Sequence, residues 1–160
     1  MRILPHELAN FFQLLGQATF YVQHVENSLH HLLALSQFEG PNSVSSEEAV
    51  AVLDRFQRKT LGGLIGYLEK HGGFGLPMDE LRLLNAERKW MIHQILKDEQ
   101  YRLTNDSTFR STVFHRLDRF VDEAQRLNKA VGEAVMALTI SKGVSRQTIA
   151  AALERELRKI

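Results

Sequence analysis

Apolar residues recur along most of the chain at intervals of three and four positions, the spacing that places them on one face of an α-helix. The first such run predicts a long helix over residues 11–33, with Pro5 suited to its first turn. Residues 37–45 contain a Gly-Pro pair and are expected to form a loop. Ser45, followed three positions later by Glu48, matches a capping box and predicts the start of a second helix.

Glycines divide the middle of the chain. A break is expected near Lys59, and Thr60 is placed to cap a short helix after it. Residues 71–77 read His-Gly-Gly-Phe-Gly-Leu-Pro. They match neither common phosphate-binding pattern and follow no visible strand, so they predict a plain connector. The next amphipathic helix is expected over residues 78–96.

The longest apolar pattern lies in the second half of the chain. After a polar stretch at residues 97–107, apolar positions alternate in steps of four and three over residues 113–138. This periodicity is typical of a bundle or coiled-coil helix. Phe114 and Val121 widen its apolar face beyond one stripe, which predicts that a second copy of the chain covers part of it.

A short final helix completes the predicted organisation. Gly143 ends the long helix, and Ser145 is placed to cap a helix over residues 145–160 whose apolar stripe should pack on the bundle. No strand alternation or internal repeat is visible, and the connectors are short. We therefore predict one all-α domain over residues 1–160, an antiparallel helical bundle.

The composition excludes several kinds of chemistry but does not identify a binding partner. The chain has no cysteine, which excludes disulfides, thiolate-held zinc and cysteine nucleophiles. Its formal charge of +1 gives no overall attraction to nucleic acid, so such binding would need a local basic patch. No leader is visible, and no window approaches the roughly 20 apolar residues that span a bilayer. We expect a cytoplasmic protein without membrane association.

One six-residue segment carries the functional argument. Arg88 and His93 enclose four residues in the sequence Arg-Lys-Trp-Met-Ile-His. This segment resembles the Arg-x4-6-His motif of the HEPN superfamily (higher eukaryotes and prokaryotes nucleotide-binding). Leu81-x-x-Leu84 and the long first helix also sit where that family's bundle would place them. The resemblance covers about residues 10–100, extending to 140 at most, and implies a HEPN-like bundle with its core at about residues 10–140.

Many HEPN proteins are metal-independent endoribonucleases whose motif residues act at a cleft formed by a homodimer. The resemblance therefore implies RNA cleavage without metal or cofactor, by a homodimeric toxin or phage-defence component with an antitoxin or regulatory partner. His93 would be the general acid or base, and Arg88 would stabilise charge on the phosphate. Other members serve as non-catalytic binding or scaffold modules. Lys89 stands where the family often has a small polar residue, and this favours that alternative.

The geometry of a regular helix does not bring the two motif residues together. Positions five apart diverge by about 140°, so Arg88 and His93 would flank a cleft, or converge if the helix is distorted between them. Lys89 shares a face with His93 and is expected to favour the neutral imidazole. Glu26, at the edge of the first helix's apolar stripe, is the acid expected to pair with Arg88.

Basic residues elsewhere predict a candidate RNA-binding surface, provided that their helices pack side by side. Its members are Arg55, Arg58, Lys59, Arg82 and Lys89. On the long helix, Arg116, Arg119 and Arg126 alternate with acidic residues. That pattern predicts a solvated face whose ion pairs join residues of the same helix.

Two further patterns have structural interpretations. His24, His30 and His31 lack the carboxylate partner of a metal-binding motif, so we expect them on the surface of the first helix rather than at a metal. Residues 143–149 resemble the turn and recognition-helix start of helix-turn-helix repressors, with Arg146 able to reach a base. A DNA-binding transcriptional regulator is therefore a weaker alternative.

Overall fold

The computed structural model describes residues 4–158, apart from the side chains of residues 152, 153, 156 and 157. Its elements in chain order are α1 (Pro5–Ser36), α2 (Ser46–Gln57), α3 (Leu61–Lys70), the 3₁₀ turn η1 (Gly73–Gly75), α4 (Met78–Lys89), the π-helix η2 (Trp90–Asp98), α5 (Gln100–Asn105), α6 (Ser107–Ser141) and α7 (Arg146–Leu157). The described residues contain no strand, so the all-α prediction is confirmed. None of the helices among them combines the length and hydropathy needed to cross a bilayer.

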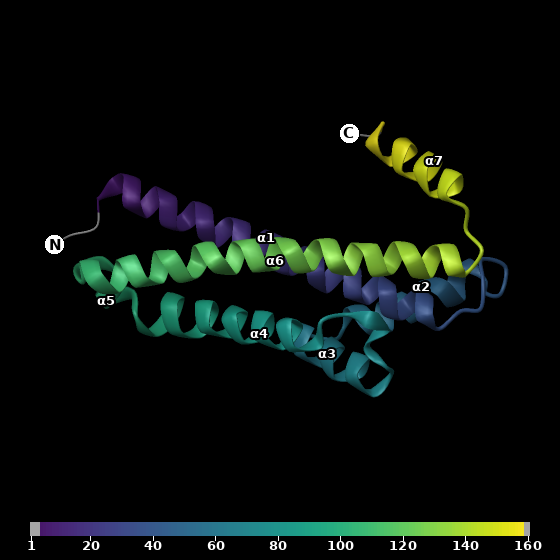
Figure 1. Cartoon of the computed structure of the whole chain (residues 1–160), viewed down its shortest axis with the longest axis horizontal. Helices are drawn as coiled ribbons and strands as arrows, with labels where there is room; N and C mark the ends of the chain where they lie inside the picture. The colour runs from purple at the N-terminus through teal and green to yellow at the C-terminus, as the bar shows by residue number, and fades with distance from the viewer. Residues whose placement is uncertain (1–3, 159–160) are drawn as a thin grey trace.

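The two longest helices form the centre of the bundle (Figure 1). α1 has 32 residues and α6 has 35, and they lie side by side with the largest helix-to-helix interface in the protein. α2 and α3 pack on α1, whereas α4 and α5 pack on α6. α3 also packs on α4 and so completes the bundle.

The core consists of the apolar stripes that the periodicity predicts. On α1, Val25 and Leu29 are fully enclosed, and Leu117 and Leu127 are enclosed on α6. Removing each leucine side chain from water contributes on the order of 1.5–3 kcal/mol. Continuous stripes on both helices therefore explain why the α1–α6 interface is the largest.

The residues that widen the apolar face of α6 are covered within the chain. Val121 is buried, and the ring of Phe114 stacks on that of Phe11 with centroids 5.9 Å apart. They do not form the uncovered second stripe from which the sequence predicted a homodimer. A homodimer would therefore need a contact surface other than this face of α6.

Helix starts coincide with the capping residues identified in the sequence. The backbone N–H of Glu48 donates to Ser45 Oγ at 3.2 Å, and the Ser45 N–H donates to the Glu48 carboxylate at 2.9 Å. Hydrogen bonds from the backbone and then the hydroxyl of Ser45 lower the pKa of Glu48. Thr60 caps α3 in a similar way, and Asp106 caps α6. Each such cap contributes about 1 kcal/mol.

The glycine-rich segment forms the predicted connector between α3 and α4. Gly72, Gly73 and Gly75 have φ values of 84°, 68° and 72°, in the left-handed region that glycine adopts without steric penalty. Phe74 also has a positive φ of 52°. The connector reverses the chain, so α3 and α4 pack against each other.

The middle of the chain differs from the prediction in two places. The helix expected to continue to residue 96 changes from α to π at Trp90. At its end, the Glu99 N–H donates to the carbonyl of Gln94, five residues earlier, at 2.8 Å. The polar stretch at residues 97–107 contains the short helix α5.

A buried arginine explains why the polar stretch folds onto the bundle. Arg110 is only 4% exposed, and its Nη1 donates to the carbonyls of Leu103 and Thr104 at 3.1 and 3.4 Å. Its Nε lies 3.5 Å from the carboxylate of Glu7 on α1. A hydrogen bond from the Leu4 N–H, followed by the charge of Arg110, lowers the pKa of Glu7. Arg110 thus joins α1, α5 and α6.

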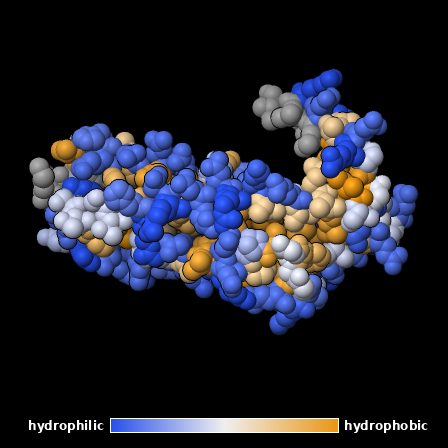
Figure 2. All heavy atoms as spheres, viewed as in Figure 1, coloured by the Kyte–Doolittle hydropathy of each residue, from blue (hydrophilic) through white to orange (hydrophobic). Residues whose placement is uncertain are grey.

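The final helix stands away from the bundle (Figure 1). Gly143, with φ 92°, ends α6, and Ser145 Oγ accepts the N–H of Thr148 at 3.1 Å, as the sequence predicted. Within the described residues, α7 has no extensive contact with another helix. Of the stripe predicted to pack on the bundle, the side chains of Leu153 and Leu157 and the whole of Ile160 lie outside the described residues. The turn between α6 and α7 directs the chain outward, and Figure 2 shows apolar residues at the surface where α6 leads into α7.

Candidate functional site

Arg88 and His93 lie on either side of the change from α-helix to π-helix. Arg88 is half-buried in the last turn of α4, and His93 is exposed in η2. In a π-helix each N–H donates to a carbonyl five residues earlier instead of four, so successive residues turn through a smaller angle. Residues five apart therefore diverge less than on a regular helix. A distortion that lets the two side chains converge therefore lies between Arg88 and His93.

The predicted ion pair between Arg88 and Glu26 does not form. Glu26 is half-buried on α1, and within the described residues no ion pair joins it to Arg88. The physical reason is the packing: α1 and α4 have no extensive contact, because α3 and α6 lie against both. Across the described part of the chain, no side-chain hydrogen bond or ion pair involves Arg88, Lys89 or His93. Their polar groups are available to a ligand.

An arginine of α6 contacts both ends of the segment around Arg88. Arg116 Nε and Nη2 donate to the two carboxylate oxygens of Glu87 at 2.8 and 2.7 Å. The guanidinium carbon lies 3.7 Å from the centre of the Trp90 ring. The sequence predicted that ion pairs on this face would stay within α6. For Arg116 that prediction is wrong, because its acidic partner belongs to α4.

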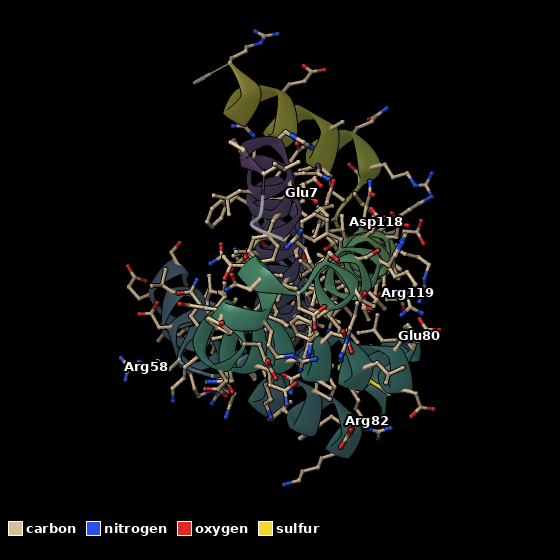
Figure 3. All side chains as sticks on the ribbon, turned by 90° about the vertical axis from the view of Figure 1, so that its left-hand side faces the viewer. Glu7, Arg58, Glu80, Arg82, Asp118 and Arg119 are labelled. Carbon is tan, nitrogen blue, oxygen red and sulfur yellow. The ribbon has the colours of Figure 1, made fainter. Side chains whose placement is uncertain are left out.

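Arg126 forms a second bridge between α6 and α4. Its Nη2 donates to Glu123 on the same helix at 2.6 Å and also to Glu80 of α4. Hydrogen bonds to Glu123 and then Glu80 raise the pKa of Arg126. The third arginine of the face, Arg119, is exposed (Figure 3). Only the Arg126–Glu123 pair is therefore of the predicted kind.

The basic residues proposed for RNA contact do not form a single patch. Arg82 Nε donates to Glu69 at 2.6 Å, and this hydrogen bond is the main cause that raises the pKa of Arg82. Arg55 donates to Gln37 Oε1 at 3.4 Å. Viewed along the bundle, Arg58 and Arg82 point outward from different sides (Figure 3). The predicted five-residue surface is therefore wrong, because acidic and polar neighbours and the helix packing separate its members.

The packing of α3 on α4 bears on two members of that surface, Lys59 and Lys89. α3 and α4 run past each other so that Glu69 meets Arg82, while a Cβ on Gly62 would lie 3.1 Å from Nδ2 of Asn85. Continuing this pairing backward along α3 and forward along α4 brings Lys59 toward the turn that carries Lys89. Both lysines are exposed.

The histidines of α1 serve structural roles. His30 is buried, contrary to the prediction that it lies on the helix surface, and its Nε2 donates to the carbonyl of Lys59 at 3.3 Å. The His31 Nδ1 donates to the carbonyl of Asn27 at 2.7 Å. The ring of His24 lies against Phe20. His30 thereby ties α1 to the turn between α2 and α3.

Among the grooves beside α6 are two whose linings bear on the motif, and one of these reaches Glu87, the residue before Arg88. One, of about 400 Å³, is lined by Glu7, Arg110 and His115 among others. The other, of about 300 Å³, lies between α4 and α6 and is lined by Glu87 and Arg116 among others. Neither groove is lined by Arg88 or His93, and His93 is exposed. Within a single chain the motif forms an open surface.

Comparisons with known proteins do not identify a relative. No family model, curated protein or solved structure matches the chain. The function is therefore argued from the site.

Proposed function

We propose that the protein is a metal-independent endoribonuclease built on an antiparallel, HEPN-like helical bundle. The observation that carries the proposal is the π-helix, which begins between Arg88 and His93. π-helical turns are rare and frequently lie at functional sites. Here the wider turn reduces the divergence of two residues whose types match the reaction. A toxin or phage-defence role in the cytoplasm, with an antitoxin or regulatory protein as partner, belongs to the same proposal.

The two residues match the chemistry of RNA cleavage without metal. The reaction needs a base for the ribose 2′-hydroxyl, an acid for the leaving oxygen, and positive charge on the phosphoryl oxygens. Histidine titrates near neutral pH, so His93 can act as base or acid. The guanidinium of Arg88 can bind phosphate with two parallel hydrogen bonds. No carboxylate in the described part of the chain competes with phosphate for Arg88.

RNA is the expected substrate, and its cleavage is the direct test. We expect the purified protein to cut RNA to products ending in a 2′,3′-cyclic phosphate, because the 2′-oxygen attacks the adjacent phosphorus. Cleavage should proceed equally with and without EDTA. The measurement is gel analysis of end-labelled RNA, with duplex DNA of the same sequence as the control. RNA that stays intact under all conditions would contradict the catalytic proposal.

A homodimer is the second expected outcome. One chain supplies one motif histidine on an open surface, so a second copy is needed to supply the complementary acid or base and to exclude water. Ile92, beside His93, is apolar and 40% exposed, which suits it to an isologous contact. Light scattering at micromolar concentration should give about twice the chain mass of 18.3 kDa. A monomer mass that persists when RNA is added would contradict this arrangement.

Two other functions are supported by particular observations. The exposed Lys89 and the open surface around His93 suit a non-catalytic module that binds RNA or a protein without cutting it. RNA binding without cleavage would identify that function. α7 stands off the bundle with Arg146 exposed at its start, which suits a DNA-binding regulator. Selective binding of the duplex DNA control would identify the latter.

A further inference from the structure

Three side chains, one each from α4, η2 and α6, meet where α4 becomes η2. Glu87 is near the end of α4, Trp90 is the first residue of η2, and Arg116 reaches both from α6. The two hydrogen bonds to Glu87 use both carboxylate oxygens, at 2.7 and 2.8 Å. Such a bidentate pair fixes the plane of the guanidinium as well as its position. The guanidinium carbon lies over the indole, 3.7 Å from the ring centre, so the ring is held as well.

The contact is better suited to setting geometry than to adding stability. The side chains of Arg116 and Glu87 are 38% and 29% exposed, and ion pairs so open to water contribute little to folding. In the chain, however, Glu87 and Trp90 bracket Arg88 and Lys89, and Trp90 lies three residues before His93. A rotation at Trp90 would turn the whole of η2 and change the direction of His93 relative to Arg88.

We infer that Arg116 is a positioning residue for the Arg88–His93 site. It holds Glu87 and Trp90 so that the change from α-helix to π-helix occurs at one fixed place. Two of its five N–H donors bond Glu87 and its guanidinium carbon lies over Trp90, so Arg116 acts on the site through these neighbours. The part of this inference that concerns catalysis rests on the proposed function, whereas the part that concerns η2 does not.

Trp90 provides a direct readout, because it is the only tryptophan in the chain. In Arg116→Ala the face of the indole loses its cover, so acrylamide should quench Trp90 fluorescence more strongly. Amide hydrogens of residues 90–98 should also exchange faster. The matched control is Arg126→Ala, which removes another arginine that bridges α6 to α4 but does not contact Trp90. The control should match wild type in both measurements.

The kinetic expectation separates positioning from binding. Misplacing a reacting group by about 1 Å can cost about 100-fold in rate, so Arg116→Ala should lower kcat by about 10- to 100-fold and leave KM unchanged. Arg116→Lys should recover little, because an ammonium group has neither the fork nor the flat face of a guanidinium. It also keeps the charge, which provides a folded variant if the alanine variant unfolds.

Each outcome decides one claim. Wild-type quenching and exchange in Arg116→Ala, or in Arg116→Lys if only that variant folds, would overturn the inference. A raised KM with an unchanged kcat would also overturn it, because Arg116 would then contact RNA. If the wild-type protein cuts no RNA, the proposed function fails, and quenching and exchange alone decide whether Arg116 holds η2.

Discussion

His93→Ala is expected to lower the rate of RNA cleavage by about two to four orders of magnitude, the usual effect of losing a general acid or base. The imidazole is exposed and has no hydrogen bond within the described residues, so its removal should leave the fold intact. The π-helix around it is closed by backbone hydrogen bonds, which alanine retains. The loss should therefore be confined to chemistry.

Single-turnover cleavage of RNA with protein in excess measures this effect without interference from product release. Circular dichroism and thermal unfolding should be the same for His93→Ala and wild type. The matched control is His115→Ala, which removes another exposed histidine, from α6. His115→Ala should cleave at the wild-type rate. Equal rates for His93→Ala and wild type would remove His93 from the mechanism.

Arg88→Lys is expected to be nearly as inactive as Arg88→Ala. Removing one group that stabilises developing negative charge typically costs about 10²- to 10³-fold in kcat. Lysine keeps the charge but presents it as a single point, whereas the guanidinium donates two parallel hydrogen bonds to phosphate. A large loss in the lysine variant would show that geometry, beyond charge, is required.

The test is the pair of kcat and KM values for Arg88→Ala and Arg88→Lys. Arg119→Lys is the matched control, since Arg119 is an exposed arginine on α6 and does not belong to the motif. It should behave as wild type. If Arg88→Lys retains most of the wild-type kcat, charge alone is sufficient and the bidentate role of Arg88 is wrong.

The helices and their starts could be predicted from local sequence, because their causes are local. Ser45, Thr60 and Ser145 each accept a backbone N–H three residues later, and each marks the start of a helix. The spacing of Val25 and Leu29 likewise predicts burial on one face of α1. Caps and stripes act within one or two turns, so the residues involved are visible together in the sequence.

The π-helix could not be predicted in the same way. Met91 and Ile95 are buried and four residues apart, a spacing that an α-helix and a π-helix both accommodate. The two forms differ in which carbonyl each N–H reaches, and the apolar pattern does not report that choice. The sequence indicated only that Arg88 and His93 would converge if the helix were distorted.

The sequence also could not predict which acidic residue pairs with an arginine when the two lie on different helices. Arg116 and Glu87 are 29 residues apart, and the pair exists because α4 and α6 pack together. Several acids lie closer to Arg116 in the chain, so local spacing favoured the wrong partner. The burial of His30 and the outward direction of α7 depend on tertiary packing for the same reason.

During synthesis, α1 is complete long before its main partner exists. Residues 37–106 separate α1 from α6, and a ribosome adds roughly 5–20 residues per second, so several seconds pass before α6 can pair with it. α2 and α3 can cover part of α1 meanwhile. Phe11, near the start of α1, stays uncovered until Phe114, on which its ring stacks, has been synthesised. The nascent chain therefore offers an apolar N-terminal helix to chaperones, or to a neighbouring nascent chain, until most of the protein has been made.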